Sequence, residues 1–127
     1  MSALALSISW MSQPKEHEYR LYVFEGSDWC HNCIRLDQKV LSTTDFMEFA
    51  QNESILVMHI DFPQKKKLDE QTTAHNAMVA EKYNFKGIFP TLILVHNESG
   101  RQTELSYANE DVETFIAKVE MEKTELR

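Results

Sequence analysis

Cys30 and Cys33 are the only thiols among the 127 residues, and they stand three positions apart. Two thiols at this spacing, on the first turn of a helix, can close a disulfide and open it again. The loop closed by such a disulfide is too short to stabilise the fold much through chain entropy. We therefore interpret the pair as a reactive dithiol whose chemistry is thiol–disulfide exchange.

The two cysteines should differ in reactivity. Cys30 is expected at the helix N-terminus, where free N–H groups and the helix dipole stabilise a thiolate, and His31 beside it can add positive charge. Such surroundings lower the pKa of a cysteine from about 8.5 into the range of about 3.5–7.5. Cys33, one turn later, should be more buried and less ionised. We expect Cys30 to form the mixed disulfide and Cys33 to resolve it.

Two other interpretations of the pair are possible. The thiols could be inert and buried, or they could bind a metal together with His31, which would make the chain a non-catalytic binding module. Zinc normally takes four ligands, and the sequence has no second cysteine pair, so a metal would have to be shared between two chains. We predict neither a resident metal nor another bound cofactor.

The amino-acid composition limits the classes of partner that the protein can bind. A net charge of −7 argues against nucleic acid as a partner and suits a soluble, freely diffusing protein. We expect the chain to be a monomer. The basic run 65–67 is interpreted as a solvated turn. The length suits one domain over 1–127, with an extension over 1–18 and a core over 19–120. Residues 1–10 are mildly apolar but too short to cross a bilayer, and they lack the basic start of a secretory signal.

The first half of the chain contains the elements that must position the cysteines. Apolar alternation predicts a strand over 4–10 and a buried strand over 19–25, directly before the motif. A helix is expected from Cys30 to about Leu41. The run 42–45 has the form of a capping box, so the helix should restart there. We expect the following core face for the restarted helix: Phe46, Met47, Phe49 and Ala50.

The second half completes an α/β sheet. The apolar run 55–60 predicts a central strand covered on both faces, in which His59 finds a hydrogen-bond partner. A helix over 72–83 should bury Ala74 and Met78. A strand over 92–95, a hairpin turn over 97–100 and an edge strand over 102–107 follow, and the last helix is capped near Asn109. We predict a mixed sheet of four to five strands with helices on both faces.

At this point three motifs carry a resemblance to the thioredoxin family over residues 19–120. They are the run 29–33 after a strand, Asp61 at the end of the apolar strand, and the run 89–91 before the next one. The runs 26–30, 61–63, 81–83 and 87–91 resemble more narrowly the bacterial exported, Dsb-type members. This resemblance implies a thioredoxin fold and a periplasmic or otherwise extracytoplasmic protein, with the cytoplasm as the alternative.

The resemblance also implies roles for individual residues. Cys30 would be the nucleophile and Cys33 the resolving thiol. Pro90, preceded by Phe89, would be a cis-proline whose loop faces the disulfide and binds the substrate backbone. Trp29 would pack beside the motif as a lid. The pair between the cysteines, His31 and Asn32, would tune the redox potential.

The same resemblance implies the substrates and the direction of electron flow. Protein disulfides would be the substrates, and an upstream redox partner of the DsbD or thioredoxin-reductase type would exchange electrons with the chain. Because no extra domain or dimerisation segment is evident, we favour a reductase over an oxidase or an isomerase.

One position departs from the family pattern. Many members carry a buried acid in the strand before the motif, and that position falls on Val23 here. Glu25 is close to this position, but its side chain should project to the opposite face from that of Phe24. We interpret Glu25 by default as a solvated acid at the end of the strand. The proton route from Cys33 is therefore left open among water, Glu25 and His31.

Overall fold

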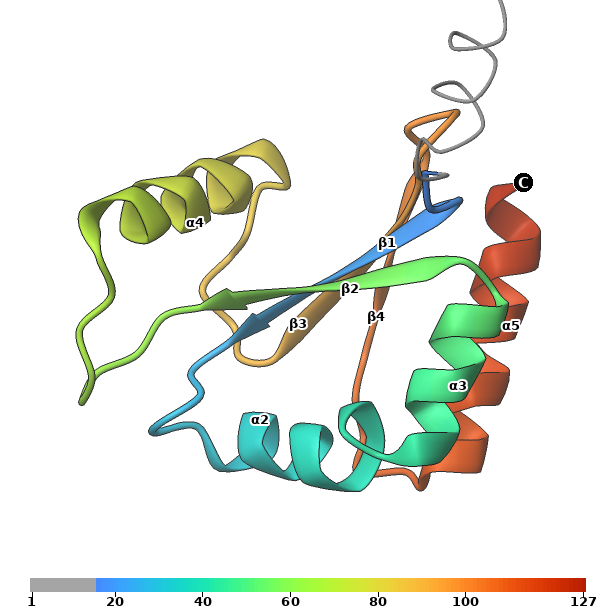
Figure 1. The fold of residues 1–127 in the computed structure, drawn as a ribbon, viewed down its shortest axis with the longest axis horizontal. Coiled ribbons are helices and arrows are strands. Elements are labelled where there is room, and N and C mark those ends of the chain that lie inside the picture. Colours follow the sequence, from blue (N-terminus) through green and yellow to red (C-terminus); the bar gives the residue numbers. More distant parts are fainter. Residues whose placement is uncertain (1–15) are drawn as a thin grey trace, which may run out of the picture.

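The computed structural model describes residues 16–127, which form a mixed four-stranded sheet with the order β2-β1-β3-β4. Strand β1 (Tyr19–Glu25) runs parallel to β2 (Ile55–Asp61) and antiparallel to β3 (Thr91–His96). Strand β4 (Gln102–Leu105) pairs antiparallel with β3 (Figure 1). The predicted mixed α/β sheet is confirmed. The strand expected over 4–10 lies outside the described residues.

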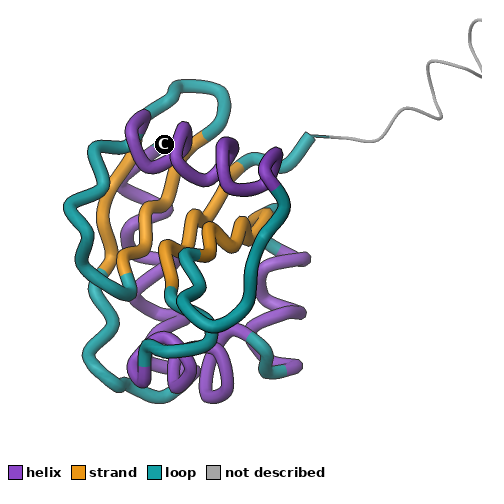
Figure 2. The backbone as a smooth tube through the Cα atoms, turned by 90° about the vertical axis from the view of Figure 1, so that its left-hand side faces the viewer, coloured by secondary structure: helices purple, strands orange, loops and turns teal. Residues whose placement is uncertain are grey.

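Helices cover both faces of this sheet. One face carries α2 (His31–Leu36), its continuation as a π-helical segment η1 (Asp37–Leu41), α3 (Thr44–Asn52) and α5 (Val112–Leu126), whereas α4 (Glu70–Lys82) covers the other face (Figure 1). In Figure 2 the strands lie between helices above and below them. The helix that follows the cysteines therefore belongs to the larger of the two layers.

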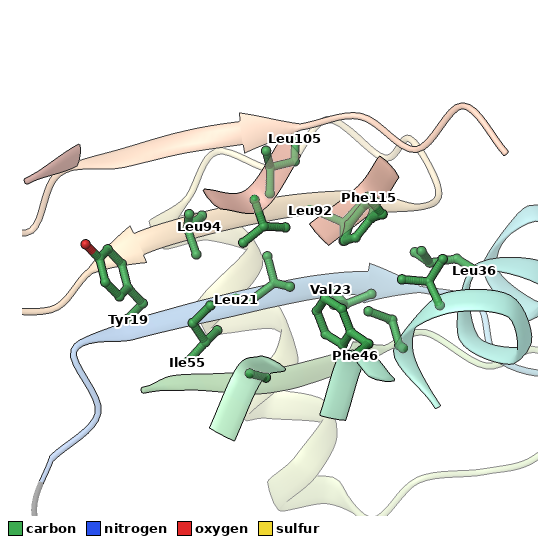
Figure 3. Close-up of a cluster of buried hydrophobic side chains, with 14 of the residues drawn as sticks. Tyr19, Leu21, Val23, Leu36, Phe46, Ile55, Leu92, Leu94, Leu105 and Phe115 are labelled. Atoms are coloured by element: carbon green, nitrogen blue, oxygen red, sulfur yellow. The ribbon is translucent and has the colours of Figure 1, made fainter. Parts of the chain in front are cut away.

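The alternation of side chains along β1 builds two separate cores. Leu21 and Val23 point into the larger one, where they pack with Leu36 and Phe46 (Figure 3). Phe24 points to the other face and packs with residues of β2, β3 and α4. Each such side chain stabilises the fold by about 1.5–3 kcal/mol when fully buried. The strand before the cysteines is thus held from both sides.

Among residues 16–127, the apolar run 55–60 forms an outer strand of the sheet rather than the expected central one. β2 pairs only with β1 and forms one edge of the described sheet, while β1 and β3 occupy the middle. The side chains over 56–58 are half-buried, and that of His59 is exposed. A continuous apolar run predicts a strand with apolar neighbours, but the run carries no information on how many strands flank it.

Two helix faces also differ from expectation. Met47 and Met78 are 59% and 65% exposed, and Ala74 is exposed as well. Helix α4 instead buries Asn76 and Val79, because it contacts the sheet through a narrow stripe. The long apolar methionines satisfy the helical spacing without reaching the core.

Helix starts are set by oxygen side chains. Thr43, Asp69 and Asp111 each accept a hydrogen bond from the backbone N–H three residues later, as N-cap residues do. The predicted cap near Asn109 is displaced to Asp111. Helix α3 restarts at the predicted break after η1.

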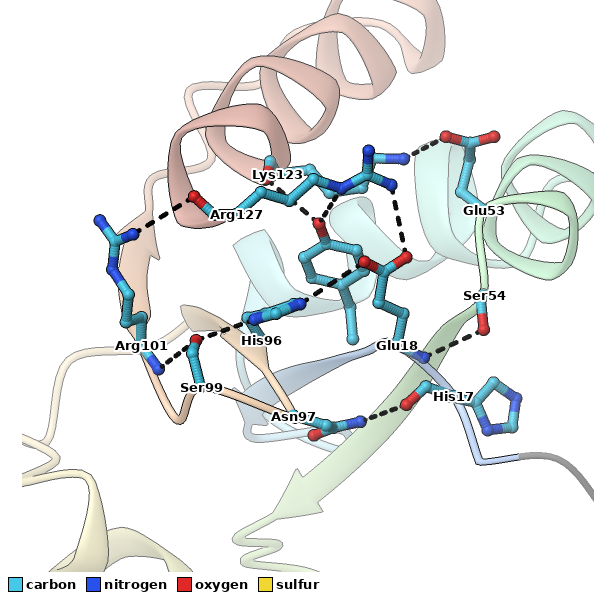
Figure 4. Close-up of polar contacts among 11 residues, drawn as sticks. His17, Glu18, Glu53, Ser54, His96, Asn97, Ser99, Arg101, Lys123 and Arg127 are labelled. Atoms are coloured by element: carbon cyan, nitrogen blue, oxygen red, sulfur yellow. Dashed lines mark hydrogen bonds and ion pairs between the residues drawn. The ribbon is translucent and has the colours of Figure 1, made fainter.

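A polar network fastens the end of the sheet that lies away from the cysteines (Figure 4). The Tyr19 hydroxyl, at the start of β1, donates to the Lys123 carbonyl oxygen at 3.2 Å and accepts from Arg127 Nε at 3.1 Å. Lys123 also forms an ion pair with Glu53. These bonds tie α5 to β1 and to the loop after α3.

In residues 16–127, no helix is long and apolar enough to cross a membrane.

Neighbouring positions on α3 provide a test of this packing. Phe46 is 1% exposed and Met47 is 59% exposed. Phe46→Ala should lower the free energy of unfolding by about 3–5 kcal/mol, because it leaves a cavity in the larger core. Met47→Ala should change it by about 0.5 kcal/mol or less. Urea denaturation measures both, and equal effects would contradict the assigned helix face.

Candidate active site

A short loop connects β1 to the helix that carries the cysteines, and its conformation depends on Gly26. The Cys30 N–H donates to the Gly26 carbonyl oxygen at 2.9 Å, which closes the turn before the helix. A Cβ atom on Gly26 would overlap the Trp29 indole ring. Glycine is therefore required here by close approach of an aromatic side chain, and Trp29 in turn packs over the loop, at the place predicted for a lid.

The two cysteines form a disulfide at the start of α2, with their Cα atoms 5.2 Å apart. Cys30 is the N-cap residue, and its Sγ accepts a hydrogen bond from the Cys33 backbone N–H at 3.2 Å. Cys30 is 8% exposed and Cys33 is 2% exposed. Cys30, at the helix N-terminus, is thus the more exposed residue of the two, and its Sγ already receives an N–H donor. This arrangement favours a thiolate at Cys30.

The residues between the cysteines lie at the surface. His31 and Asn32 are exposed on the first turn of α2, and Asn32 Oδ1 accepts from an Arg35 guanidinium nitrogen at 3.5 Å. Both side chains therefore stand beside the disulfide rather than beneath it.

Asp28 ties the loop before Cys30 to the segment that follows β2. Its carboxylate accepts backbone N–H bonds from Gln64, Lys65 and Lys66 at 2.9, 2.9 and 2.8 Å. These donors, the Gln64 N–H above all, lower the pKa of the Asp28 carboxyl below its ordinary value. The side chains of the basic run 65–67 are exposed, as predicted.

Further bonds fasten the same two segments. The Asp61 carboxylate accepts from the Ser27 backbone N–H at 2.9 Å and from the Ser27 hydroxyl at 2.6 Å. Trp29 Nε1 donates to the Phe62 carbonyl oxygen at 2.8 Å. From the sequence alone, Asp61 was recognisable only as a motif residue, and Ser27 and Asp28 had no predicted role. The expected parallel pairing of the two strands could have predicted this contact. The carboxyl ends of parallel strands meet at one edge of the sheet, so the segments that follow them lie close together.

Phe89 and Pro90 lie next to this loop. The Phe89 ring packs edge-on against Trp29, with centroids 5.1 Å apart, and it also contacts Phe85 and Phe62. The Phe89–Pro90 peptide bond is cis. The structure thus brings the run 89–91 and the motif together, as the resemblance implies.

Glu25 is not a solvated acid, and this prediction is wrong. It is 8% exposed, and its Oε2 lies 3.1 Å from Nδ1 of His59. His59 does find the expected hydrogen-bond partner, although its side chain is 45% exposed. The hydrogen bond to Glu25 raises the pKa of His59 above its ordinary value, against the opposing effect of partial burial. Val23 is fully buried.

Metal-ligating groups do not gather in the described part of the chain. Across residues 16–127, no three His, Cys, Asp or Glu side chains are placed so that they could hold one metal ion.

Comparison with known proteins agrees with this geometry. A family model described as a thioredoxin-like domain matches residues 11–120. The chain therefore belongs to the thioredoxin-like family.

One relative lies in the Dsb group. The disulfide bond reductase DsbH of Chlamydia pneumoniae is 27% identical over 105 residues, which are 83% of this chain. The match spans 62% of that protein's length, so the chain corresponds to somewhat less than two thirds of it. A solved structure of a DsbH oxidoreductase superposes with a TM-score of 0.73 at 28% identity, covering 94% of this chain and 78% of that one.

More distant structures share the fold. The reduced C-terminal domain of DsbD from Neisseria meningitidis matches with a TM-score of 0.55 at 17% identity, covering 94% of both chains. A thioredoxin from Thermus thermophilus matches with a TM-score of 0.54 at 16% identity, covering 94% of this chain and 80% of that one.

The contact between Gly26 and Trp29 can be tested by a double-mutant cycle. Gly26→Ala should destabilise the protein, because the indole must leave its place and lose its bond to Phe62. In a Trp29→Ala background the same change should cost clearly less, since the overlapping ring is gone. Urea denaturation of the four proteins measures the coupling. Equal costs in both backgrounds would contradict the contact.

The Asp28 bonds predict a pH dependence. Because the folded-state pKa of Asp28 is lowered, its carboxylate contributes stability above the ordinary carboxyl pKa, 3.8, and loses it as the pH falls through the lower folded value. Wild type should be more stable than Asp28→Asn at pH 7, and the difference should vanish in strong acid. Denaturation at a series of pH values checks this, with the exposed Asp45→Asn as control. A difference that does not change with pH would contradict it.

Proposed function

We propose that the chain is a thiol–disulfide oxidoreductase that reduces disulfides in other proteins through Cys30 and Cys33. One observation carries the proposal: the two sulfurs form a disulfide at the N-terminus of α2, with the Cys33 N–H directed at Cys30 Sγ. The likeness to the disulfide bond reductase DsbH supports the same activity and the same direction of electron flow.

The reaction proceeds by two exchanges. The Cys30 thiolate attacks one sulfur of the client disulfide, whose S–S bond breaks, and the released client sulfur takes up a proton. The Cys33 thiolate then attacks Cys30 Sγ, so that the Cys30–Cys33 disulfide forms and the second client sulfur leaves. Two electrons pass from the cysteine pair to the client. An upstream dithiol reduces the pair again by the same steps in reverse.

The groups around the disulfide support this sequence of events. The helix N-terminus stabilises the Cys30 thiolate, and the exposed His31 and Asn32 adjust how readily it forms. The backbone of Phe89 and Pro90 binds the client polypeptide beside the two sulfurs. Trp29 covers the loop next to them, where its ring contacts Phe89.

Partners and compartment are inferred in the same way. Electrons pass between sulfurs, so the exchange needs no bound cofactor. We infer an upstream donor of the DsbD or thioredoxin-reductase type and an extracytoplasmic, periplasmic setting, on the strength of the Dsb-type relative. We further infer a monomer organised as one domain over 1–127, with its core over 19–120.

The activity is tested by redox titration in glutathione buffers of graded potential. Wild type should show one reversible two-electron transition in Trp29 fluorescence, measured in a Trp10→Phe background. A potential towards the thioredoxin value of about −270 mV would support a reductase, and one towards about −120 mV would overturn that direction. Absence of a transition would refute the oxidoreductase.

The order of attack is tested by trapping. Cys33→Ser should accumulate a mixed disulfide with a client protein, because nothing resolves it. Cys30→Ser should accumulate none. Non-reducing electrophoresis and mass spectrometry identify the linked cysteine. Trapping through Cys33 in the Cys30→Ser variant would reverse the assignment.

A further inference from the structure

The loop between β2 and α4 lies beside the cysteine motif and carries three consecutive lysines. This lysine loop, residues 62–68, leaves the sheet at the same end as the segment that leads to Cys30 (Figure 1). Asp28 stands two positions before Cys30, and its carboxylate accepts the backbone N–H groups of Lys65 and Lys66 at 2.9 and 2.8 Å. Because Asp28 binds the backbone of the loop, the three lysine side chains are left exposed to solvent.

The lysines of this loop differ in their ionic partners. Lys66 pairs with Asp61 at 3.3 Å. Lys65 and Lys67 form no ion pair within residues 16–127, and residues 1–15 contain no aspartate or glutamate. Two ammonium groups without a carboxylate partner therefore face water beside the motif.

The carboxylates on the loops at this end of the sheet are, by contrast, bound within the protein. Those of Asp69 and Asp111 cap the helices α4 and α5. Glu110 forms an ion pair with a lysine of α5, and Asp28 and Asp61 accept hydrogen bonds from neighbouring loops. The chain as a whole carries a net charge of −7. The free charges of the lysine loop are thus positive on a protein that is otherwise acidic, and charge complementarity favours an acidic partner.

An apolar cavity of about 610 Å³ lies between the lysine loop and the first half of α4. Lys66 and Lys67 stand on its wall together with Glu70, a carboxylate that has no ion pair among residues 16–127. The apolar part of the wall consists of Phe62, Pro63, Leu68, Ala74 and Ala77. The cavity can therefore take an apolar side chain, while the lysines beside it can bind carboxylates.

Phe62 connects this cavity with the motif. Its carbonyl oxygen accepts from Trp29 Nε1 at 2.8 Å, and its ring centroid lies 5.9 Å from that of Phe89. An extended chain spans about 3.3–3.6 Å per residue. A client whose disulfide meets Cys30 can therefore reach the cavity with a segment that lies only a few residues from its own cysteine.

We propose that the lysine loop and the cavity behind it form a docking surface for client proteins. The surface selects a client segment in which an apolar side chain stands next to carboxylates. The proposal rests on the disulfide reduction proposed above and names the class of client that this site favours. Binding of the segment holds the client disulfide near Cys30 and so raises its effective concentration there.

Disulfide-linked peptide pairs test this selection. One strand carries a tripeptide about five residues from its cysteine, a distance that the chain can span to the cavity. The tripeptide is Glu-Leu-Glu, Lys-Leu-Lys or Glu-Ser-Glu, placed before the cysteine in one series and after it in another. The ratio of two kcat/KM values of the same protein is the readout, so a change in cysteine reactivity cancels.

Wild type should prefer the acidic, apolar tripeptide in at least one series. Its kcat/KM should be about tenfold higher with Glu-Leu-Glu than with Lys-Leu-Lys at low salt, the lower end of what electrostatic steering contributes. It should also be about tenfold higher than with Glu-Ser-Glu, the lower end for an apolar group in a hydrophobic pocket. In 1 M salt, where charges are screened beyond about 3 Å, only the second preference should remain.

Charge reversal tests the lysines. The double variant Lys65→Glu/Lys67→Glu should reverse the preference between acidic and basic tripeptides. A matched control, Lys39→Glu/Lys82→Glu, changes the net charge equally at exposed lysines outside the loop and should keep the wild-type preference. Glu70→Gln removes the free carboxylate from the cavity wall and should strengthen the preference for the acidic tripeptide.

A larger side chain tests the cavity. Ala77→Phe should fill part of it and remove the preference for leucine over serine, while the charge preference stays. Met78→Phe is the control, because Met78 is 65% exposed on the same helix and does not line the cavity.

The outcomes separate this proposal from the proposed function. Equal rates with all peptide pairs in wild type would overturn the docking surface while leaving the exchange reaction intact. An acidic preference that Lys65→Glu/Lys67→Glu retains would also overturn it. Failure of wild type to reduce any of the pairs would instead refute the proposed function.

A second copy of this chain is the competing occupant. Its helix α5 presents Met121, 65% exposed, between Glu120 and Glu122. Sedimentation over a range of protein concentrations measures self-association. Self-association that Lys65→Glu/Lys67→Glu abolishes would assign the surface to a second copy and overturn client docking, whereas a wild-type monomer at all concentrations would support it.

Discussion

The parallel, in-register pairing of β1 with β2 is the constraint on which the site depends. It sets Glu25 opposite Asp61, so the carboxyl ends of both strands fall at one edge of the sheet. The loops that leave this edge run side by side and can be joined through Ser27, Asp28 and Trp29. The segment before Cys30 therefore has a defined conformation before the helix begins.

The two faces of the sheet support the site in different ways. On one face, Leu36 packs into the larger core and holds the helix that carries the cysteines against β1. On the other face, Asn76 of α4 donates to the Asp61 carbonyl oxygen at 2.9 Å and supports the strand end that binds Ser27. One face thus holds the helix that carries the cysteines, and α4 supports the end of β2 from the other face.

The fold class and the cysteine site were largely predictable, because they rest on local patterns. The strand over 19–25, the helix start at Cys30 and the run 89–91 each have signatures within a few residues. The burial of Glu25 and the outer position of β2 in the sheet of residues 16–127 were not predictable in this way. Whether a strand-end acid meets water depends on which strand and helix cover it, and those come from distant parts of the chain.

The sequence by itself determined the chemistry: two thiols at a helix start, with an imidazole beside them and a proline loop ahead of the next strand. Spacing along the chain is enough for this, since a helical turn brings Cys30 and Cys33 together without help from elsewhere. Only the tertiary structure decided the surroundings of that chemistry. It paired Glu25 with His59 across two strands and left the imidazole in contact with water, because burial and charge are set by neighbours that the sequence places 34 residues apart.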